Sequence, residues 1–415
     1  MPLIKEQMLH WVNRFSICSF LDNHQYVSAY NTVECIAAVG AMRVFKGPAA
    51  PAQIDAFFKE HRDWLFGHFA YEFGRSNLSQ IHTQQLHLIG FDDACFVQPE
   101  TVLQLSNHIL TIDAAIADPD LIFKSICDCT IATQIGHPAI TVQARTSKTD
   151  YLFIVEQLLA HILRGDCYEI NFCQEFFAEN VSLNPLLLYQ ALTKISPNPF
   201  SCYYKVNNAH LICASPERYL QKKGNILRSQ PIKGTNKRNS TNAAADNELK
   251  NQLRNSTKDQ IENVMVVDLV RNDLSRVCKA GTVSVEELFG IYRFPQVHQM
   301  ISTVIGELKA GLGLNEIIAS SFPMGSMTGA PKKKVMELID CYEPIPRGLY
   351  SGAMGYINPS MDFDFNVVIR SMLYNTNTQY LSYHVGSGIT FQSKPEEEYQ
   401  ECLLKAQAMN TILSQ

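Results

Sequence analysis

Residues 211–233 hold two apolar runs, LICASPERYL and ILRSQPIK, joined by a Lys-Lys-Gly-Asn turn, a pattern typical of a β-hairpin. The length of the loop decides where two side chains point. A three-residue loop centred on Asn225 puts Glu217 and Lys233 opposite each other on one face of a sheet, whereas a two-residue Gly-Asn turn sends them to opposite faces. We expect the odd-length loop, or a bulge. This segment then holds a carboxylate and an amine on a common face.

The rest of the chain mixes strand-like and helical segments without an internal repeat or a long linker. Short apolar runs separated by turn residues suggest mixed strands and short helices over 25–50 and 64–115. Helices are predicted at 150–165, where Gly165 ends the apolar stripe, from about Asn247 to Val277, at 332–341, and from Pro395 to the C-terminus. The polar stretch Thr235–Asn247 predicts a loop directly after the lysine.

The composition permits a large core and excludes some partners. Of the 415 residues, 46% are hydrophobic and 18% charged, and the net charge is −5, which gives no support to nucleic-acid or anionic-membrane binding. No apolar run reaches the roughly 18–20 residues of a membrane span, and the N-terminal segment reads as an amphipathic helix rather than a signal peptide. The twelve scattered cysteines indicate reduced thiols in a cytoplasmic protein.

Two pairs of carboxylates stand three residues apart on predicted helices, Asp259 with Glu262 and Glu398 with Glu401. This spacing puts both carboxylates of a pair on one helix face. Acidic pairs on helices usually face water, but Glu262 adjoins the apolar run VMVVDLV, and charges among apolar groups are seldom left unpaired. Two such faces brought together make the all-oxygen site that Mg²⁺ prefers.

Single residues elsewhere are weaker signals of binding or catalysis than the two carboxylate pairs. Lys233 is a nucleophile only when unprotonated, and without other signals it reads as a solvated turn lysine. A lone histidine in an apolar stretch, such as His298, is usually structural. The segment Gly386-Ser387-Gly388 is either a plain turn or a corner that offers backbone N–H groups to an anion. Arg370 and Lys405 would add charge-assisted hydrogen bonds there.

Four segments together resemble the chorismate-utilising enzymes: PIKGT around Lys233, KDQIENVMVVDLVRNDLSRV, MTGAPK and EEEYQECLLKA. The resemblance is dense from about Asp150 to the end and thinner before it, where FGHFAYEFG still fits. It implies an α/β (α+β) fold of large antiparallel sheets packed face to face, with helices outside and chorismate between the sheets. We expect one domain over 1–415, with an N-terminal subdomain to about residue 145 and a catalytic region from about 146.

The resemblance also implies roles for individual residues. Lys233 would attack C2 of chorismate and expel the C4 hydroxyl, with Glu217 as an acid/base group and His298 as a general acid. Ammonia would then add at C4 and release the lysine. The implied Mg²⁺ ligands are Glu262 and Glu401, assisted by Asp259 and Glu398. The implied substrate-binding residues are Arg370, Gly386, Ser387, Gly388, Tyr350, Thr328 and Lys405.

Lys233 separates the branches of the family. Aminodeoxychorismate synthases resemble this chain in carrying lysine there, whereas anthranilate synthases and most isochorismate synthases carry alanine. Glu169, in GDCYEIN, stands where isochorismate synthases have a water-activating lysine. The resemblance thus favours amination of chorismate, the first step toward p-aminobenzoate and folate. The alternatives are anthranilate synthase, isochorismate or salicylate synthase, and a binding subunit without catalysis. The segment YNTVECIAAV is a poor match to the tryptophan-sensing segment of anthranilate synthases.

The source of ammonia is expected to be another protein. No cysteine lies in a G-x-C-x-G elbow, so hydrolysis of glutamine by the usual nucleophile is not expected. We therefore expect a separate glutaminase subunit, with free ammonia as a substitute in vitro. No fused lyase is expected after the last helix.

Overall fold

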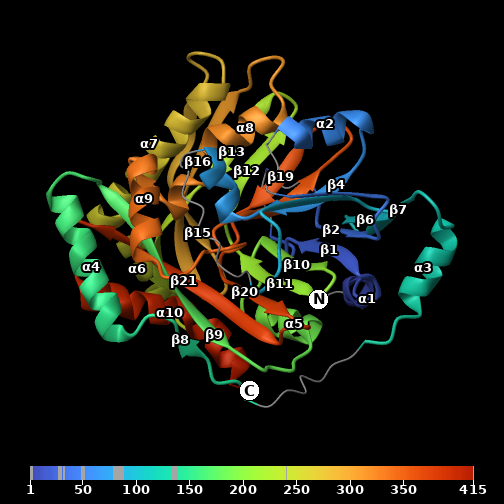
Figure 1. Ribbon diagram of the computed structural model, residues 1–415, viewed down its shortest axis with the longest axis horizontal. Coiled ribbons are helices and arrows are strands. Elements are labelled where there is room, and N and C mark those ends of the chain that lie inside the picture. The colour runs from blue at the N-terminus through green and yellow to red at the C-terminus, as the bar shows by residue number, and fades with distance from the viewer. Residues whose placement is uncertain are drawn as a thin grey trace.

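The computed structural model describes residues 3–26, 30, 33–47, 52–77, 88–131, 139–239 and 241–414. Two large sheets fill the middle of the molecule in Figure 1, and every strand pair within them is antiparallel. This arrangement confirms the predicted fold class. Within the described ranges, no helix is long and apolar enough to cross a membrane.

The larger sheet has eleven strands in the described chain. Their spatial order is β17 (Gly329–Ala330), β9 (Glu169–Ala178), β21 (Tyr380–Thr390), β20 (Ser371–Asn375), β11 (Ala209–Ser215), β10 (Phe200–Val206), β1 (Ile17–Asp22), β2 (Cys35–Val39), β6 (Thr101–Ser106) and β7 (Ile109–Ala114), with β8 (Gln143–Ala144) beside β9.

The second sheet has ten strands over the same ranges. Their order is β14 (Ile232–Lys237), β16 (Val297–Glu307), β13 (Ile226–Gln230), β12 (Arg218–Lys223), β19 (Phe363–Asn366), β18 (Ala353–Ile357), β4 (Leu65–Phe69), β5 (Ala94–Gln98) and β3 (Arg43–Gly47), with β15 (Ser284–Arg293) beside β16. Strands from before residue 146 pair with later ones in both sheets, and the division into two regions stays a prediction.

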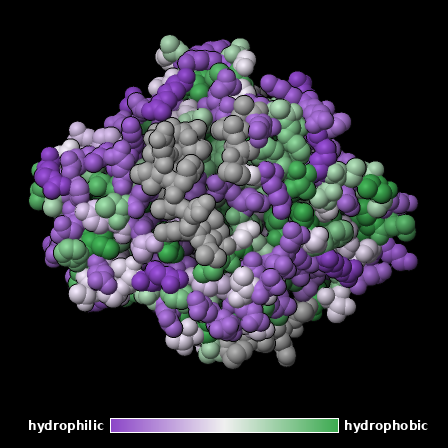
Figure 2. Space-filling model, viewed as in Figure 1, coloured by the Kyte–Doolittle hydropathy of each residue, from purple (hydrophilic) through white to green (hydrophobic). Residues whose placement is uncertain are grey.

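Helices cover the outer faces. They are α1 (Leu3–Val12), α2 (Ala52–Glu60), α3 (Pro119–Cys127), α4 (Lys148–Leu163), α5 (Pro185–Ile195), α6 (Ala243–Arg254), α7 (Thr257–Val277), α8 (Leu314–Ser321), α9 (Lys332–Tyr342) and α10 (Pro395–Leu413), with the 3-10 turns η1 (Tyr71–Asn77) and η2 (Gly325–Met327). In Figure 1, α4, α10 and α5 lie on the lower side, and α7, α8 and α2 on the upper side. Figure 2 shows apolar atoms over α3, where Leu121 and Phe123 are exposed.

Most of the side chains that face inward are apolar. One cluster of buried residues joins α4, α5 and α10 to the larger sheet, and another joins α7 and α8 to the second sheet. All twelve cysteines are free, and Cys127 and Cys341 are the two exposed ones. Among the described residues, most buried charged groups have an oppositely charged or hydrogen-bonding partner, and several of them lie at the candidate site.

The hairpin that holds Glu217 differs from the expected one. Lys223 pairs with Ile226, so the turn has two residues, and Gly224 takes the positive φ of 61° that such turns need. The odd-length loop was therefore wrong, but a bulge between Arg218 and Gln221 does shift the register. Because Pro231 has no N–H for the ladder, the chain leaves the hairpin there, and β14 pairs with β16 instead.

The single long helix after residue 247 was also wrong. The chain forms α6 and then α7, because the hydroxyl of Ser256 accepts the N–H of Asp259 at 3.3 Å and starts a second helix. The polar stretch after Lys233 is not one loop either, since β14 continues to Lys237 and α6 begins at Ala243. The helices predicted at 150–165, at 332–341 and from Pro395 are confirmed as α4, α9 and α10.

Candidate active site

Lys233 and Glu169 join the two sheets at one point. Lys233 lies on β14 of the second sheet and Glu169 on β9 of the larger one, and their amine and carboxylate form an ion pair and a hydrogen bond. Gly388 of β21 lies against this pair, and a Cβ there would collide with the lysine amine. Glycine at 388 therefore leaves free the space that the lysine amine occupies.

The free protein holds Lys233 as an ammonium group. Burial by itself would lower the pKa of this amine, but the charges of Glu169, Glu262 and Glu401 outweigh burial and raise the pKa above its ordinary value. A nucleophilic lysine must lose this proton first. In the resting state the direct hydrogen-bond partner of Lys233 is Glu169, and the charge of Lys233 also acts on Glu217.

Glu217 is nearly inaccessible to water and has a perturbed acidity. Burial raises the pKa of its carboxyl group to about 7, against the smaller lowering effects of the Ser326 hydroxyl, the Ile232 N–H, and the charges of Lys233 and Arg370. A carboxyl group with such a pKa is partly protonated near neutral pH, which suits an acid/base group.

Arg370 lies near Glu217 in a strained backbone conformation. Its φ of 49° falls in the left-handed region that non-glycine residues rarely adopt, and its carbonyl accepts the N–H of Ala214 at 3.1 Å. Burial lowers the pKa of its guanidinium to about 10, although the charge of Glu217 opposes this. Within the described chain, no carboxylate forms an ion pair with Arg370, so this cation remains available to an anion.

The main predicted metal ligands come from two helices that face Lys233. Glu262 on α7 and Glu401 on α10 both act electrostatically on Lys233. Burial raises the pKa of Glu262, whereas the charge of Lys405 lowers that of Glu401. Glu401 and Lys405 form a 2.7 Å ion pair, with 44% and 42% of their side chains exposed, so solvent screens this pair and a ligand can replace it.

The other two predicted metal ligands, Glu398 and Asp259, lie beside β21 and β14, the strands that hold Gly388 and Lys233. The hydroxyl of Ser387 donates to the buried Glu398 on α10. Asp259 on α7 lies against β14, so that a Cβ on Gly234 would be 3.0 Å from its Oδ1 atom. Both predicted doublets therefore border the region around Lys233 and Gly388.

The donors suit Mg²⁺ better than a softer metal. Over the described ranges, no three His, Cys, Asp or Glu side chains converge closely enough to form a complete protein cage. Mg²⁺ does not need one, because it usually keeps several waters and binds one or two carboxylates together with its substrate. Glu262 and Glu401 provide such oxygen donors.

The remaining predicted substrate residues are largely engaged with the protein itself. Tyr350 is buried, and its ring stacks on His384 with 5.1 Å between centroids. The hydroxyl of Thr328 donates to the Met324 carbonyl at 3.0 Å. Lys405 also donates to the Gly386 carbonyl at 2.8 Å, so the segment 386–388 presents a carbonyl as well as N–H groups.

His298 is held by a partner that the sequence did not reveal. Its ring is fully buried on β16, and its Nε2 lies 3.0 Å from Oδ1 of Asp246 on α6. No contact with Lys233 or Glu217 occurs among the interactions of the described residues.

Sequence reasoning missed three contacts at this site: Glu169 as the partner of Lys233, Ser326 as the donor to Glu217, and Asp246 as the partner of His298. Ser326 lies two residues before Thr328, which the sequence had already assigned to the site. Its position could therefore have identified it as a site residue. Asp246 lies in a polar stretch in which nothing in the sequence indicated a contact with His298.

Comparison with known proteins agrees with this architecture. A family model described as chorismate binding enzyme matches residues 20–411, and the chain belongs to this family of enzymes, which act on chorismate. The chain is 33% identical over 375 residues to aminodeoxychorismate synthase component 1 of Bacillus subtilis, covering 86% of this chain and 78% of that protein. The component 1 protein of Salmonella typhimurium is 36% identical over 271 residues, 65% of this chain and 58% of its own length.

A solved structure shows the same fold. Anthranilate synthase component I from Streptococcus pneumoniae superposes with a TM-score of 0.79 at 22% identity, covering 93% of this chain and 94% of that one. At this identity the likeness concerns the fold, and the branch of the family must be argued from the site.

Proposed function

We propose that this chain is an aminodeoxychorismate synthase component that aminates chorismate at C4 for p-aminobenzoate and folate synthesis. The observation that carries the proposal is the position of Lys233, buried between the sheets, bonded to Glu169 and facing the carboxylates of Glu262 and Glu401. The relatives named aminodeoxychorismate synthase component 1 support the same reading.

Binding of the chorismate dianion is assigned to the cations and N–H groups around Lys233. Arg370, which lacks a carboxylate partner in the described chain, holds one carboxylate, and the 386–388 segment and Lys405 hold the other. Tyr350 and Thr328 line the site. Bound Mg²⁺ would neutralise the ring carboxylate, held by Glu262 and Glu401 with Asp259 and Glu398 assisting.

Catalysis begins with a proton transfer between two side chains. Desolvation by the substrate favours the neutral forms of an ion pair, so Lys233 passes its proton to Glu169 through their direct hydrogen bond. The neutral amine then attacks C2, both conjugated ring double bonds shift, and the C4–O bond breaks. Glu217 donates its proton to the departing hydroxyl, which leaves as water.

The second half replaces the lysine with ammonia. Ammonia bonds to C4, both ring double bonds shift back, and the C2–N bond breaks with its electron pair returning to Lys233, which then regains its proton from Glu169. The new ammonium group at C4 gives one proton to Glu217, which restores the acid. His298 is the alternative source of the single proton that the departing hydroxyl takes up, and its hydrogen bond to Asp246 would fix the ring for that role.

The ammonia comes from a separate glutaminase subunit in this proposal. The relatives' name, component 1, implies a second component, and no cysteine of this chain lies in a G-x-C-x-G elbow. The cytoplasm remains the predicted compartment.

Product identification tests the proposal directly. The purified chain is incubated with chorismate, Mg²⁺ and ammonium, and the products are identified by mass spectrometry. We expect aminodeoxychorismate. Anthranilate or isochorismate as the main product would move the chain to a neighbouring branch, and unconsumed chorismate without metal binding would identify a non-catalytic binding subunit.

A further inference from the structure

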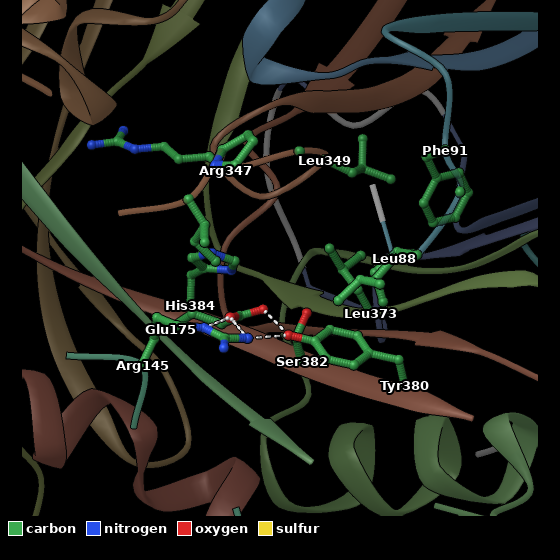
Figure 3. A pocket seen from close by; sticks show the side chains of 15 residues that line it. Leu88, Phe91, Arg145, Glu175, Arg347, Leu349, Leu373, Tyr380, Ser382 and His384 are labelled. Carbon is green, nitrogen blue, oxygen red and sulfur yellow. Dashed lines mark hydrogen bonds and ion pairs between the residues drawn. The ribbon is translucent and has the colours of Figure 1, made fainter. Parts of the chain in front are cut away.

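A cavity of about 260 Å³ lies beside the candidate active site, behind the stacked rings of Tyr350 and His384. One of its walls is apolar and comes from segments far apart in sequence. Figure 3 shows Leu88, Phe91, Leu349 and Leu373 on one side of the cavity and His384 on the other. The cavity reaches the surface at Leu88, which is 38% exposed.

The charged groups along the bottom of Figure 3 already satisfy one another. Arg145 donates from Nε to Glu175 at 3.0 Å and from Nη2 to the Tyr380 hydroxyl at 2.8 Å. Tyr380 in turn donates to Glu175 at 2.8 Å. This network carries no net charge, so it offers an entering ligand neither a free cation nor a free carboxylate.

Arg347, at the other edge of the cavity, is saturated as well. Its guanidinium donates to both oxygens of Glu343 at 2.6 and 2.8 Å, to the Met327 carbonyl at 2.6 Å, and to the Asn171 carbonyl at 2.7 Å. A charged ligand in this cavity would lose its hydration without gaining an opposite charge. The lining therefore selects for uncharged molecules.

His384 is the polar group left without a partner. Its side chain is 5% exposed, and neither ring nitrogen has a hydrogen-bond partner in the described chain. Burial, together with the charges of Arg347 and Arg145, lowers the pKa of its imidazole to about 3, so the ring is neutral. A neutral imidazole offers one donor and one acceptor, and buried groups of this kind are normally satisfied.

We propose that this cavity binds a small uncharged molecule with an apolar ring and one polar edge, of the class of phenols and aromatic amides. The ring packs between Leu88, Leu349 and Leu373, and the polar edge exchanges hydrogen bonds with His384. The volume equals several water molecules at about 30 Å³ each, and the apolar wall gives such waters few partners. The site is separate from the chemistry proposed for Lys233.

Direct binding of defined probes tests this site without any assay of activity. Benzamide and phenol are titrated into the full chain labelled with ¹⁵N-histidine, with benzoate as the charged counterpart. We expect a saturable shift of the His384 ring resonances with benzamide or phenol and a much weaker response to benzoate. The resonances are assigned by their loss in His384→Phe.

Two variants separate the site from a general effect. His384→Phe keeps a ring against Tyr350 but removes both nitrogens, and should weaken benzamide binding about tenfold by calorimetry, the factor that one lost hydrogen bond gives. Leu88→Trp, at the partly exposed mouth, should block entry to the cavity while Leu349 and Leu373 stay unchanged. It keeps the test valid if His384→Phe does not fold. The exposed His61→Phe is the control and should bind as the wild type does.

The proposal is overturned if no saturable shift of His384 occurs up to the solubility limit of either uncharged probe, which would leave water as the occupant. Binding of equal strength to the wild type and to both cavity variants would overturn it too.

Discussion

At the scale of the residue, the nucleophile proposed here is stored in its unreactive form. Glu169 holds the Lys233 ammonium directly, and Glu262 and Glu401 add to the negative charge around it. The arrangement protects a buried amine from unwanted chemistry, and it makes deprotonation depend on whatever displaces water from the site. Both catalysis and stability therefore depend on this one pair.

Lys233→Ala should lose much of its turnover rate while it keeps chorismate affinity within about tenfold, or about 1.4 kcal/mol, because the other anion-binding groups remain. Lys233→Arg should be no better, since arginine does not deprotonate in proteins. Turnover and calorimetric affinity are compared. A lysine adduct trapped on the Lys233 peptide, with chorismate present and ammonia withheld, would support the covalent route, and full activity of Lys233→Ala would refute it.

The same pair predicts a pattern of stabilities. Lys233→Ala leaves the buried Glu169 carboxylate unpaired and should cost about 3 kcal/mol of unfolding free energy. Adding Glu169→Gln removes that charge and should recover most of the loss. Denaturant unfolding of the two single variants and the double variant measures this. Strictly additive losses would mean that the two groups do not interact.

Glu217 predicts a pH-dependent stability. Its folded pKa of about 7 lies above its ordinary value of 4.5, so the folded state binds the proton more tightly. The stabilisation that the protonated Glu217 gives the folded state is fully present below pH 4.5 and is lost as the pH rises through about 7. The free energy of unfolding falls by about 3 kcal/mol over this range. Relative to Glu217→Gln, the wild type should lose about that much between about pH 5 and about pH 8 in unfolding experiments. An unchanged difference would rule out the raised pKa.

At the scale of the element, two helices bring their carboxylates to strands of the two different sheets that meet at Lys233. α7 begins at the Ser256 cap, so Asp259 and Glu262 fall in its first turns beside β14. α10 begins at Pro395, which places Glu398 and Glu401 near β21 in the same way. The sequence spacing predicted each face, whereas their meeting around Lys233 depends on how the sheets pack.

Glu262→Gln or Glu401→Gln should abolish turnover at modest Mg²⁺ and leave the fold intact, because each change keeps the size of the side chain and removes only its charge. The matched controls are the exposed Asp268→Asn on α7 and Glu397→Gln on α10, which should keep wild-type turnover. Mg²⁺ titrations of activity and circular dichroism provide the measurements. Turnover within a few fold of the wild type in both ligand variants would remove these residues from the metal site.

Local signals in the sequence predicted several elements well. Gly165, at φ 82°, ends α4, and Pro395 begins α10, as expected. The errors occurred where two local signals competed. Ser256 interrupts an otherwise continuous helical pattern, and the bulge after Arg218 corrects a two-residue turn that would have had the wrong parity. Such choices depend on packing beyond the segment.

At the scale of the whole molecule, the candidate site exists only after the sheets meet. Lys233 and Glu169 are 64 residues apart and belong to different sheets, so no periodicity in the sequence connects them. Family resemblance supplied the catalytic role of Lys233, but the ion pair to Glu169 required the tertiary structure. Tertiary structure was also needed for His384. The sequence of its strand does not reveal that its ring nitrogens have no hydrogen-bond partner in the described chain.

The whole chain should consume chorismate with ammonium salts, best at a pH high enough to provide free ammonia, and should do nothing with glutamine. The reason is that the chain has no cysteine in the usual glutaminase elbow. Chorismate loss is followed by absorbance with each nitrogen source. Glutamine-dependent turnover by the purified chain alone would contradict the need for a second subunit.

The strand order of the larger sheet has a consequence for synthesis on the ribosome. β20 and β21 lie between β9 and β11, which precede them in the chain and are therefore made earlier. Until residues 371–390 emerge, the facing edges of β9 and β11 have unpaired N–H and C=O groups. A nascent chain therefore exposes two unpaired strand edges until residues 371–390 are made, and such edges favour aggregation.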